Sequence, residues 1–344
     1  MTLSPGPPPW PIPPSWTVTT PSAATGPPPP AEPVTPPSGP PHRTVALLAP
    51  DDAGVRDVLG AVPGVRVDAR SIPAPAPGFA GVRDLADAAA RALSEGADGV
   101  VIVAGTEAPD ETAWALDLLH PGDAPLVLAA NPDHTTDVAD AISVAAAAPY
   151  RAGCLLVTRG EIHAARHVRR IGTDALVLAS PGAGPMGHVT AGVVRLAWRP
   201  PERLTLRGGT DGTAGGTAGG TAGGTNGGTH GGPGGGSPRV GLHTVTLGDD
   251  GELLGALAER CDGLIVTATA TGGVPPEAAG ALAGASARIP VVLVSPIAHS
   301  SLPVTRLDPL KARVLMHLLL AAGRDRDAVI AAFAAAERPG PAQL

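Results

Sequence analysis

Apolar segments that alternate with helical patterns organise the chain from Thr44 onward. Near-continuous apolar runs, typical of strands buried on both faces, occur at 44–50, 99–103, 124–130 and 152–158. Between them lie amphipathic segments, such as 82–93, in which apolar residues recur every three or four positions. Strands that alternate with helices in this way predict a doubly wound parallel sheet covered on both faces.

The same alternation returns in the second half of the chain. Strands are predicted at 239–247, 263–269 and 290–296, separated by helical segments at 250–261 and 276–287. Two further helices, at 309–323 and 327–336, close this part. We therefore expect a second, smaller parallel-sheet unit of the same α/β class.

Composition separates these two units from the rest of the chain. Of the 41 prolines, 17 fall within the first 44 residues, and 16 of the 46 glycines lie between Gly208 and Gly236. Neither segment offers the apolar side chains that a packed core needs. The sequence predicts a disordered Pro-rich tail at 1–43, an α/β domain at 44–200, a flexible Gly/Thr-rich linker at 201–237 and an α/β domain at 238–344.

Charge and apolar run length exclude several classes of protein. A formal charge of −7 argues against nucleic-acid binding, which needs clustered Lys and Arg. No apolar run approaches the 18 or so residues that cross a bilayer, and the N-terminus shows no secretion signal, so we expect a cytoplasmic protein without membrane contact. Cys154 and Cys261 are predicted to be reduced, inert thiols.

The turn that follows the apolar run 99–103 is the first candidate for chemistry. In open α/β sheets ligands bind beyond the carboxyl ends of strands, which places Gly105, Thr106 and Glu107 at such an edge. Asp110 and Glu111 come next, in the first turn of a predicted helix, where carboxylates complement the helix dipole.

Other patterns have competing interpretations. His163 and His167, beside Glu161, have the spacing of metal ligands on one face of a helix, but no third ligand has a matching spacing. The glycines of a GxGxxG pattern at 182–187 precede a predicted strand rather than a helix, which argues against dinucleotide binding. His299, Ser300 and Ser301 follow a strand, yet no GxSxG elbow surrounds them.

Five stretches together resemble the bacterial L-asparaginase and glutaminase family. They cover most of the chain from Thr44 to Ala336, and they are 98–119, 151–170, 180–192, 262–276 and 307–322. The resemblance implies a two-domain α/β fold that assembles into dimers or tetramers, each active site being completed by a neighbouring subunit. It also implies hydrolysis of L-asparagine to L-aspartate and ammonia through a threonine nucleophile, without metal or cofactor.

Carried over residue by residue, the resemblance assigns a partial site. Thr106 matches the family's second catalytic threonine, Gly105 and Glu107 match substrate-binding positions, and Arg170 stands where the family has a lysine. Glu107 replaces the usual aspartate. The family's nucleophile lies in a Thr-Gly-Gly-Thr turn, whereas the corresponding residues 50–52 are Pro-Asp-Asp, so the usual nucleophile is missing.

Two functional hypotheses follow. In the first, the protein is an asparaginase-like amidohydrolase that uses Thr106, with Arg170 and Glu107 lining its site. In the second, it is a catalytically inactive homologue that binds a small amide or amino-acid ligand, or a partner protein. An activated nucleophile is indispensable to this chemistry, which favours the second hypothesis on mechanism.

Overall fold

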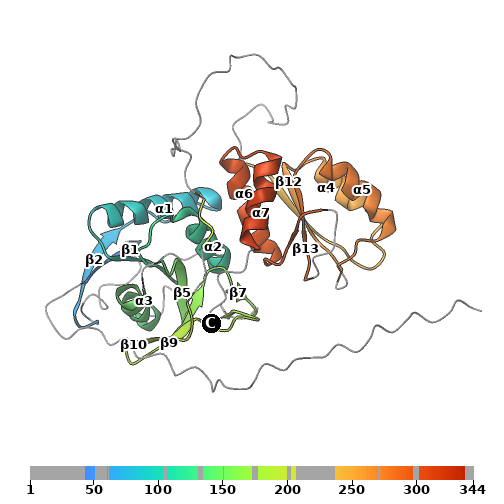
Figure 1. Cartoon of the computed structure of the whole chain (residues 1–344). Coiled ribbons are helices and arrows are strands. Elements are labelled where there is room, and N and C mark those ends of the chain that lie inside the picture. Colours follow the sequence, from blue (N-terminus) through green and yellow to red (C-terminus); the bar gives the residue numbers. More distant parts are fainter. Residues whose placement is uncertain are drawn as a thin grey trace, which may run out of the picture. The chain divides into compact units, whose positions relative to one another are not determined.

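The computed structural model shows a mixed α/β protein whose two larger sheets are each flanked by helices (Figure 1). It describes residues 43–50, 60, 62–103, 107–130, 135–149, 151–172, 177–199, 203–206, 237–269, 272–296 and 302–337. The predicted Pro-rich tail lies outside these residues except for Arg43, as does most of the predicted Gly/Thr-rich linker. The predicted helix after Gly54 falls largely outside them too.

The first sheet has eight strands in the order β10-β9-β6-β5-β4-β3-β1-β2. Its five parallel strands are β1 (Arg43–Ala49), β2 (Val65–Ser71), β3 (Gly99–Val103), β4 (Leu126–Ala129) and β5 (Cys154–Thr158). Each of these strands except the edge strand β2 is largely or wholly buried, which confirms the predicted parallel sheet.

The sheet continues beyond β5 with three antiparallel strands, which the sequence pattern did not predict. They are β6 (Glu161–Ala164), β9 (Gly187–Thr190) and β10 (Val193–Leu196). Two-residue turns at Arg159–Gly160 and Ala191–Gly192 reverse the chain, with φ between 51° and 75° at all four residues. Positive φ at both central residues gives the turn type whose twist matches a hairpin.

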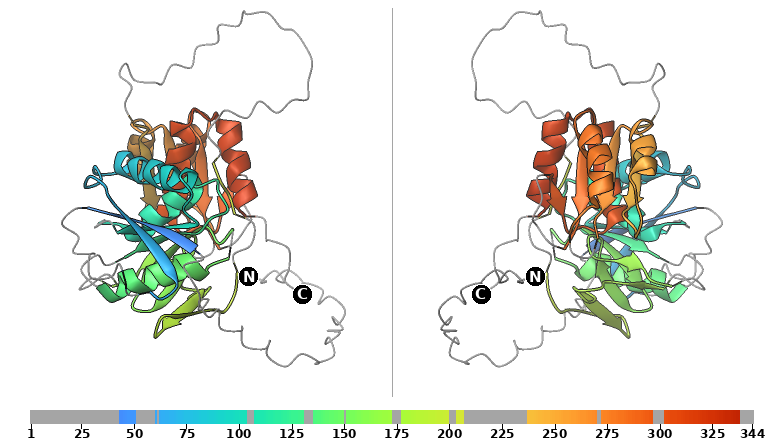
Figure 2. Two further views of the ribbon diagram at one scale, coloured as in Figure 1. Left: turned by 90° about the vertical axis from the view of Figure 1, so that its left-hand side faces the viewer. Right: turned by 90° about the vertical axis from the view of Figure 1, so that its right-hand side faces the viewer.

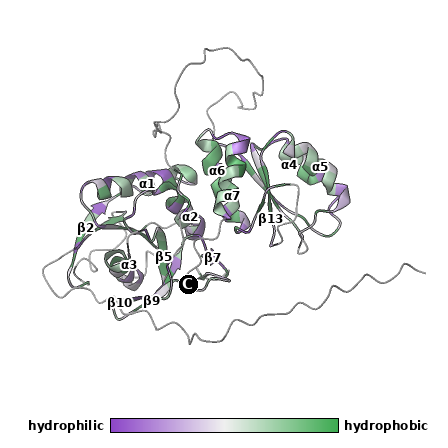
Figure 3. Ribbon diagram, viewed as in Figure 1, coloured by the Kyte–Doolittle hydropathy of each residue, from purple (hydrophilic) through white to green (hydrophobic). Residues whose placement is uncertain are grey.

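Helices cover both faces of the first sheet (Figures 1 and 2). α1 (Phe79–Ser94) and α2 (Pro109–Leu119) pack on one face, and α3 (Thr135–Ala147) packs on the other. Successive residues of β3 point to opposite faces, so Ile102 joins the α1 and α2 side while Val101 joins the α3 side. In Figure 3, α1 alternates between hydrophobic and hydrophilic residues, as a helix on the surface of a sheet requires.

The second sheet is wholly parallel, in the order β11-β12-β13-β14. Its strands are β11 (Val240–Thr244), β12 (Gly263–Thr267), β13 (Val291–Val294) and β14 (Val304–Thr305). α4 (Glu252–Ala258) and α5 (Pro276–Ser286) cover one face, and α6 (Pro309–Ala321) and α7 (Arg326–Ala336) cover the other. This confirms the second α/β unit.

Helix α2 contributes buried side chains to two hydrophobic clusters, one on each of its sides. Ala113 and Leu116 pack under the first sheet, whereas Trp114 and Leu118 join a cluster with α6, α7 and the second sheet. The Trp114 indole donates a hydrogen bond of 3.0 Å to the carbonyl oxygen of Lys311 on α6. α2 is therefore fixed on both flanks, and its N-terminus is held in a defined place beside β3. Among the described residues, no helix is long and apolar enough to span a membrane.

Candidate functional site

The candidate site is built around the first turn of α2, which follows the carboxyl end of β3. Gly105 and Thr106 lie outside the described residues, while Glu107 is exposed just before the N-cap residue Ala108. Pro109 occupies the first turn, where its missing N–H costs no hydrogen bond. Asp110 and Glu111 also lie in this turn, as predicted from the sequence.

The short strand β7 (Arg169–Arg170) brings Arg170 to this helix terminus. β7 pairs in antiparallel fashion with β8 (Leu178–Ala179). The backbone N–H of Arg170 donates a hydrogen bond of 3.1 Å to Asp110 Oδ2, so the buried Asp110 carboxylate joins α2 to β7. The structure thus brings Arg170 to the helix turn that follows Thr106 in sequence.

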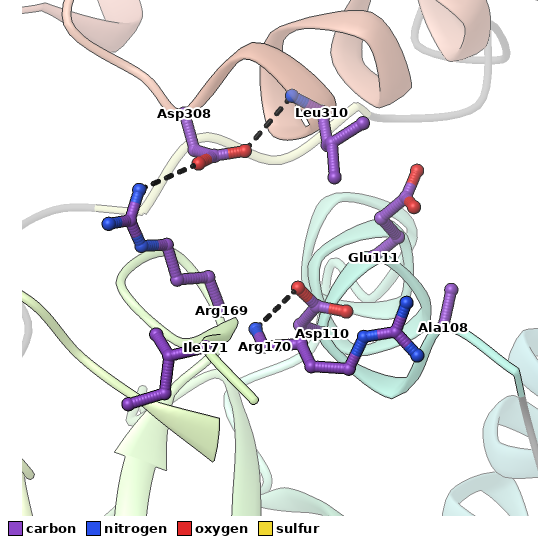
Figure 4. Close-up of a pocket in the computed structure, with 8 residues that line it drawn as sticks. All are labelled: Ala108, Asp110, Glu111, Arg169, Arg170, Ile171, Asp308 and Leu310. Atoms are coloured by element: carbon purple, nitrogen blue, oxygen red, sulfur yellow. Dashed lines mark hydrogen bonds and ion pairs between the residues drawn. The ribbon is translucent and has the colours of Figure 1, made fainter. Parts of the chain in front are cut away.

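Arg169 and Arg170 point in different directions (Figure 4). The Arg170 side chain runs past Asp110 toward Ala108 and Glu111, whereas Arg169 reaches toward Asp308. Arg169 Nη1 lies 3.6 Å from Asp308 Oδ2. Within the described part of the chain the exposed Arg170 guanidinium has no ion-pair partner. Consecutive strand residues alternate in direction, which explains why only one of the two arginines finds Asp308.

A pocket of about 390 Å³ lies between these groups; we call it the candidate pocket. Its lining residues come from the first turn of α2, from β7 and from the start of α6: Ala108, Asp110, Glu111, Arg169, Arg170, Ile171, Asp308 and Leu310. Two of them, Ile171 at 56% exposure and Leu310 at 41%, are large apolar side chains open to solvent. The pocket therefore combines both signs of charge with an apolar rim.

Glu111 and Asp308 both line the candidate pocket, but their carboxylates differ in the partners that surround them. The pKa of Glu111 is raised, mainly by burial and then by repulsion from Asp110, although Arg313 and Lys311 lower it in part. Asp308 is occupied on both oxygens, because Oδ1 accepts the backbone N–H of Leu310 at 3.0 Å and caps α6 while Oδ2 faces Arg169. A cationic group in the pocket would therefore be stabilised best beside Glu111.

Lys311 lies directly behind the pocket and is the only lysine in the chain. Its side chain is buried, and Nζ donates hydrogen bonds to the carbonyl oxygens of Asp110 at 3.1 Å and Ala165 at 2.7 Å. Burial lowers its pKa to about 8, although nearby carboxylates, Asp110 first, oppose the shift. Its rarity is the one feature that distinguishes this lysine in the sequence. Its contacts depend on pairing α6 with α2, which no local pattern reveals.

Several other candidates fall elsewhere. Pro50 follows β1, while Asp51 and Asp52, the other residues at the position of the usual nucleophile, lie outside the described residues. The serines and histidine at 299–301 lie outside them as well. Asp117 is buried at the other end of α2, where Oδ1 accepts hydrogen bonds from Arg203 and from the backbone N–H of Cys154.

The helical arrangement considered for His163 and His167 is wrong. His163 lies on strand β6, where its ring contacts Ser180 Oγ at 3.0 Å and Glu161 Oε2 at 3.2 Å. Its pKa is lowered, mainly by burial. His167 lies in the following turn with its ring edge-on to Trp198 at 5.7 Å. The hairpin turn at Arg159–Gly160 places His163 on a strand instead of a helix, so the four-residue spacing does not bring the two rings to one face.

Comparisons with known proteins agree with this architecture. The family model "Asparaginase, N-terminal" matches residues 60–202. A curated relative, the probable L-asparaginase of Deinococcus radiodurans, is 28% identical over 274 residues, which is 70% of this chain and 76% of the relative. The solved structure of the probable cytoplasmic L-asparaginase of Campylobacter jejuni superposes with a TM-score of 0.64 at 20% identity, covering 85% of this chain and 99% of that one. These comparisons show that the chain is similar to asparaginases in the N-terminal part that the family model matches and in its overall fold.

Proposed function

We propose that this asparaginase-like protein binds a small amino acid or its ω-amide in the candidate pocket and does not hydrolyse it by the family's threonine route. The observation that carries this proposal is the Arg170 guanidinium. It is exposed, lines the pocket and has no ion-pair partner within the described part of the chain. A fixed, unpaired cation in a pocket is a natural partner for a ligand carboxylate.

The shape of the guanidinium suits this role better than an ammonium would. Its planar fork can donate two parallel hydrogen bonds to one carboxylate, which adds geometric specificity to charge attraction. The backbone hydrogen bond from Arg170 to Asp110 fixes the strand from which the side chain projects. A ligand carboxylate at Arg170 would also lie near the positive end of α2.

The α-ammonium group of a bound amino acid needs a carboxylate that accepts its hydrogen bonds. Glu107 is exposed at the entrance to α2, and Glu111 lines the pocket beside Arg170. An incoming ammonium group would stabilise the ionised form of Glu111, whose pKa is raised by burial and by Asp110. Glu107 and Glu111 are therefore the residues that we assign to the α-amino group.

Hydrolysis by the family mechanism is disfavoured by residue chemistry. A guanidinium stays protonated at neutral pH and cannot accept a proton, so Arg170 cannot activate a hydroxyl as a neutral lysine amine can. Residues 50–52, at the position of the usual nucleophile, are Pro-Asp-Asp. The side chains that line the described pocket include no hydroxyl and no thiol.

The second candidate function is amide hydrolysis through Thr106. It is favoured by the length of the match to a probable L-asparaginase and by the Gly105-Thr106-Glu107 turn, which retains a hydroxyl next to an acid. In this case Arg170 would hold the substrate carboxylate, and the base would have to come from another group. The two functions share a binding site and differ in whether ammonia is released.

Calorimetric titration of the purified chain tests the binding proposal. L-aspartate, L-asparagine and L-glutamine are the ligands, and we expect at least one to bind. Arg170→Gln should weaken that binding by about tenfold or more, because a charge-assisted hydrogen bond pair is lost. The matched control is Arg195→Gln, which removes an exposed arginine of β10 away from the pocket. Equal affinities for both variants would reject the assignment.

An ammonia-release assay with the same ligands separates the two functions. We expect no release above that of buffer. Release that Thr106→Ala abolishes would overturn the inactive-homologue proposal and establish the amidase. Release that survives Thr106→Ala would instead point to another nucleophile and would reject both mechanisms as stated.

The resemblance also leads us to propose that the chain forms a homodimer or homotetramer. The exposed apolar residues Ile171 and Leu310 at the rim of the candidate pocket are consistent with a covering surface there. Multi-angle light scattering of the purified chain measures the assembled mass. A monomer at micromolar concentration would remove this proposal without affecting the binding experiment.

A further inference from the structure

A second and larger cavity, of about 1050 Å³, shares the Arg169–Asp308 pair with the candidate pocket. We call it the second cavity. Both residues of the pair line both spaces. On one side it is bounded by Val294 and Ser295, where β13 ends, and on the other by the turn 164–167 that follows β6. The edge formed by the carboxyl ends of parallel strands is where open α/β sheets bind ligands.

Four arginines line the second cavity, and three of them have a carboxylate partner. Their ion pairs are Arg203 Nε to Asp117 Oδ1 at 3.0 Å, Arg306 Nε to Glu337 Oε2 at 3.2 Å, and Arg169 Nη1 to Asp308 Oδ2 at 3.6 Å. Each of these acids also lines the cavity. Within each pair the positive and the negative charge cancel, so the three pairs give the cavity little net charge.

Arg166 is different. Its guanidinium donates a hydrogen bond of 2.6 Å, from Nη2 to the carbonyl oxygen of Ala336 at the end of α7. Within the described residues it has no carboxylate within ion-pair distance, which leaves the charge of this half-buried guanidinium without a direct counterion. Burial accordingly lowers the pKa of Arg166, with Glu337 and Asp117 opposing the shift only from a distance.

Neighbouring groups add to the positive potential at this point. Lys311, whose ammonium is bonded to the carbonyl oxygens of Asp110 and Ala165, is buried next to the same turn. His167 lines the cavity, and its pKa is lowered first by burial and then by repulsion from Arg166 and Lys311. A neutral His167 ring still offers an N–H donor. Residues 164–167 therefore present the half-buried Arg166 cation and a neutral donor, His167, to the second cavity.

We propose that the second cavity binds a small oxyanion, a carboxylate or a phosphate group, against Arg166. Such an anion would supply the missing counterion and accept hydrogen bonds from the guanidinium N–H groups that meet no acceptor among the described residues. His167 would donate a further hydrogen bond. The site is separate from the candidate pocket and does not depend on the function proposed for Arg170.

Titration of the full chain with two probes tests this site at low ionic strength. Inorganic phosphate represents the phosphate class, and acetate represents the carboxylate class. We expect at least one probe to bind, with an affinity about tenfold or more weaker in Arg166→Gln and less reduced in Arg166→Lys, which keeps the charge. Arg195→Gln should bind like the wild type. The probe that binds more tightly identifies the class of natural ligand.

Arg170→Gln distinguishes this site from the candidate pocket. If the anion sits at Arg166, the part of probe binding that Arg166→Gln removes is retained in Arg170→Gln, whether or not the function proposed for Arg170 holds. Loss of probe binding in Arg170→Gln together with retention in Arg166→Gln would overturn the proposal, and so would failure of both probes to bind the wild type.

A measurement on the wild-type chain avoids any effect of the substitution on folding. Arginine-specific dicarbonyl reagents modify accessible guanidinium groups, and peptide mapping by mass spectrometry locates the modified positions. Saturating probe should protect Arg166 at least severalfold while leaving Arg195 unprotected. Equal modification of Arg166 with and without the probe would contradict the proposal.

Discussion

Lys311 Nζ donates a hydrogen bond of 3.1 Å to the carbonyl oxygen of Asp110, so the only lysine of the chain joins helix α6 to the first turn of α2. The Asp110 carboxylate in turn accepts the backbone N–H of Arg170. Asp110 thus links α6, a helix of the second sheet, to β7, the strand that carries Arg170. The geometry of the candidate pocket depends on how the two α/β units pack.

Replacing Lys311 by methionine should destabilise the protein although it removes a buried charge. The variant leaves the carbonyl oxygens of Asp110 and Ala165 without these donors, and an unsatisfied buried polar group costs about 1–3 kcal/mol. Relief of the buried charge offsets part of this, so we expect a net loss of about 2 kcal/mol in the free energy of unfolding.

Urea unfolding followed by circular dichroism measures this loss. Arg91→Met, at an exposed position of α1, is the matched control and should change the unfolding free energy by less than about 0.5 kcal/mol. A Lys311→Met variant as stable as the wild type would show that the ammonium contributes nothing to the contact between α2 and α6.

The stability of the wild type should rise with pH in alkaline solution relative to Lys311→Met. Burial lowers the pKa of Lys311 from 10.5 to about 8, so between these values the unfolded chain binds a proton that the folded chain has released. The neutral amine keeps two N–H donors for its two carbonyl acceptors, so the hydrogen bonds survive deprotonation.

The difference in unfolding free energy between wild type and variant should therefore increase from pH 8 to pH 10.5. The increase can reach about 3 kcal/mol, because each unit of pKa shift corresponds to about 1.4 kcal/mol. This increase is measured by urea unfolding of the wild type and of Lys311→Met at half-unit intervals of pH. A difference that is constant or falls over this range would mean that the folded protein does not hold Lys311 with a lowered pKa.

Local pattern was sufficient for most of the fold. β3, β4 and β5 are near-continuous apolar runs, and α1 buries Leu85 and Ala89 at the predicted helical spacing. The prediction failed at the far edge of the first sheet: Arg159–Gly160 and Ala191–Gly192 each form a two-residue hairpin turn, which makes this edge antiparallel.

The candidate site was only partly predictable for a different reason. Arg170 and the acids of the first α2 turn stand out in the sequence. Asp308 and Arg169, however, are 139 positions apart, and their pairing exists only because α6 packs against α2. The same holds for the two carbonyl contacts of Lys311. Interactions of this kind depend on tertiary structure, and a single sequence carries no periodicity that reports them.

The buried pair of Asp117 and Arg203 should be strongly coupled. Both side chains are about nine-tenths buried, and Arg203 also donates hydrogen bonds to the carbonyl oxygens of Asp117, His120 and Gly122. Burial raises the pKa of Asp117 despite the nearby Arg203 cation, which shows how costly this charge would be without its partner. Removing one partner of such a pair costs about 3–5 kcal/mol.

We therefore expect Arg203→Met to lower the free energy of unfolding by about 3 kcal/mol or more. Asp117→Asn should be milder, because the amide oxygen can still accept the backbone N–H of Cys154. In the double variant the losses should not add, since the uncompensated carboxylate is gone, and the coupling energy should be at least about 1 kcal/mol. Strictly additive losses in urea unfolding would show that the two groups act independently.

Gly153 tests the same pair from its backbone side. A Cβ at this position would lie 2.4 Å from Asp117 Oδ1 and 2.5 Å from Arg203 Nε, so Gly153→Ala would push into the ion pair. Its φ of +79° adds strain for any L side chain. Gly182 has a similar φ of +86°, but a methyl group there would have nothing within 4 Å, so Gly182→Ala carries the strain without the clash. We expect Gly153→Ala to lower the thermal midpoint clearly more than Gly182→Ala does. Equal shifts would mean that backbone strain alone, and not contact with Asp117 and Arg203, requires glycine at position 153.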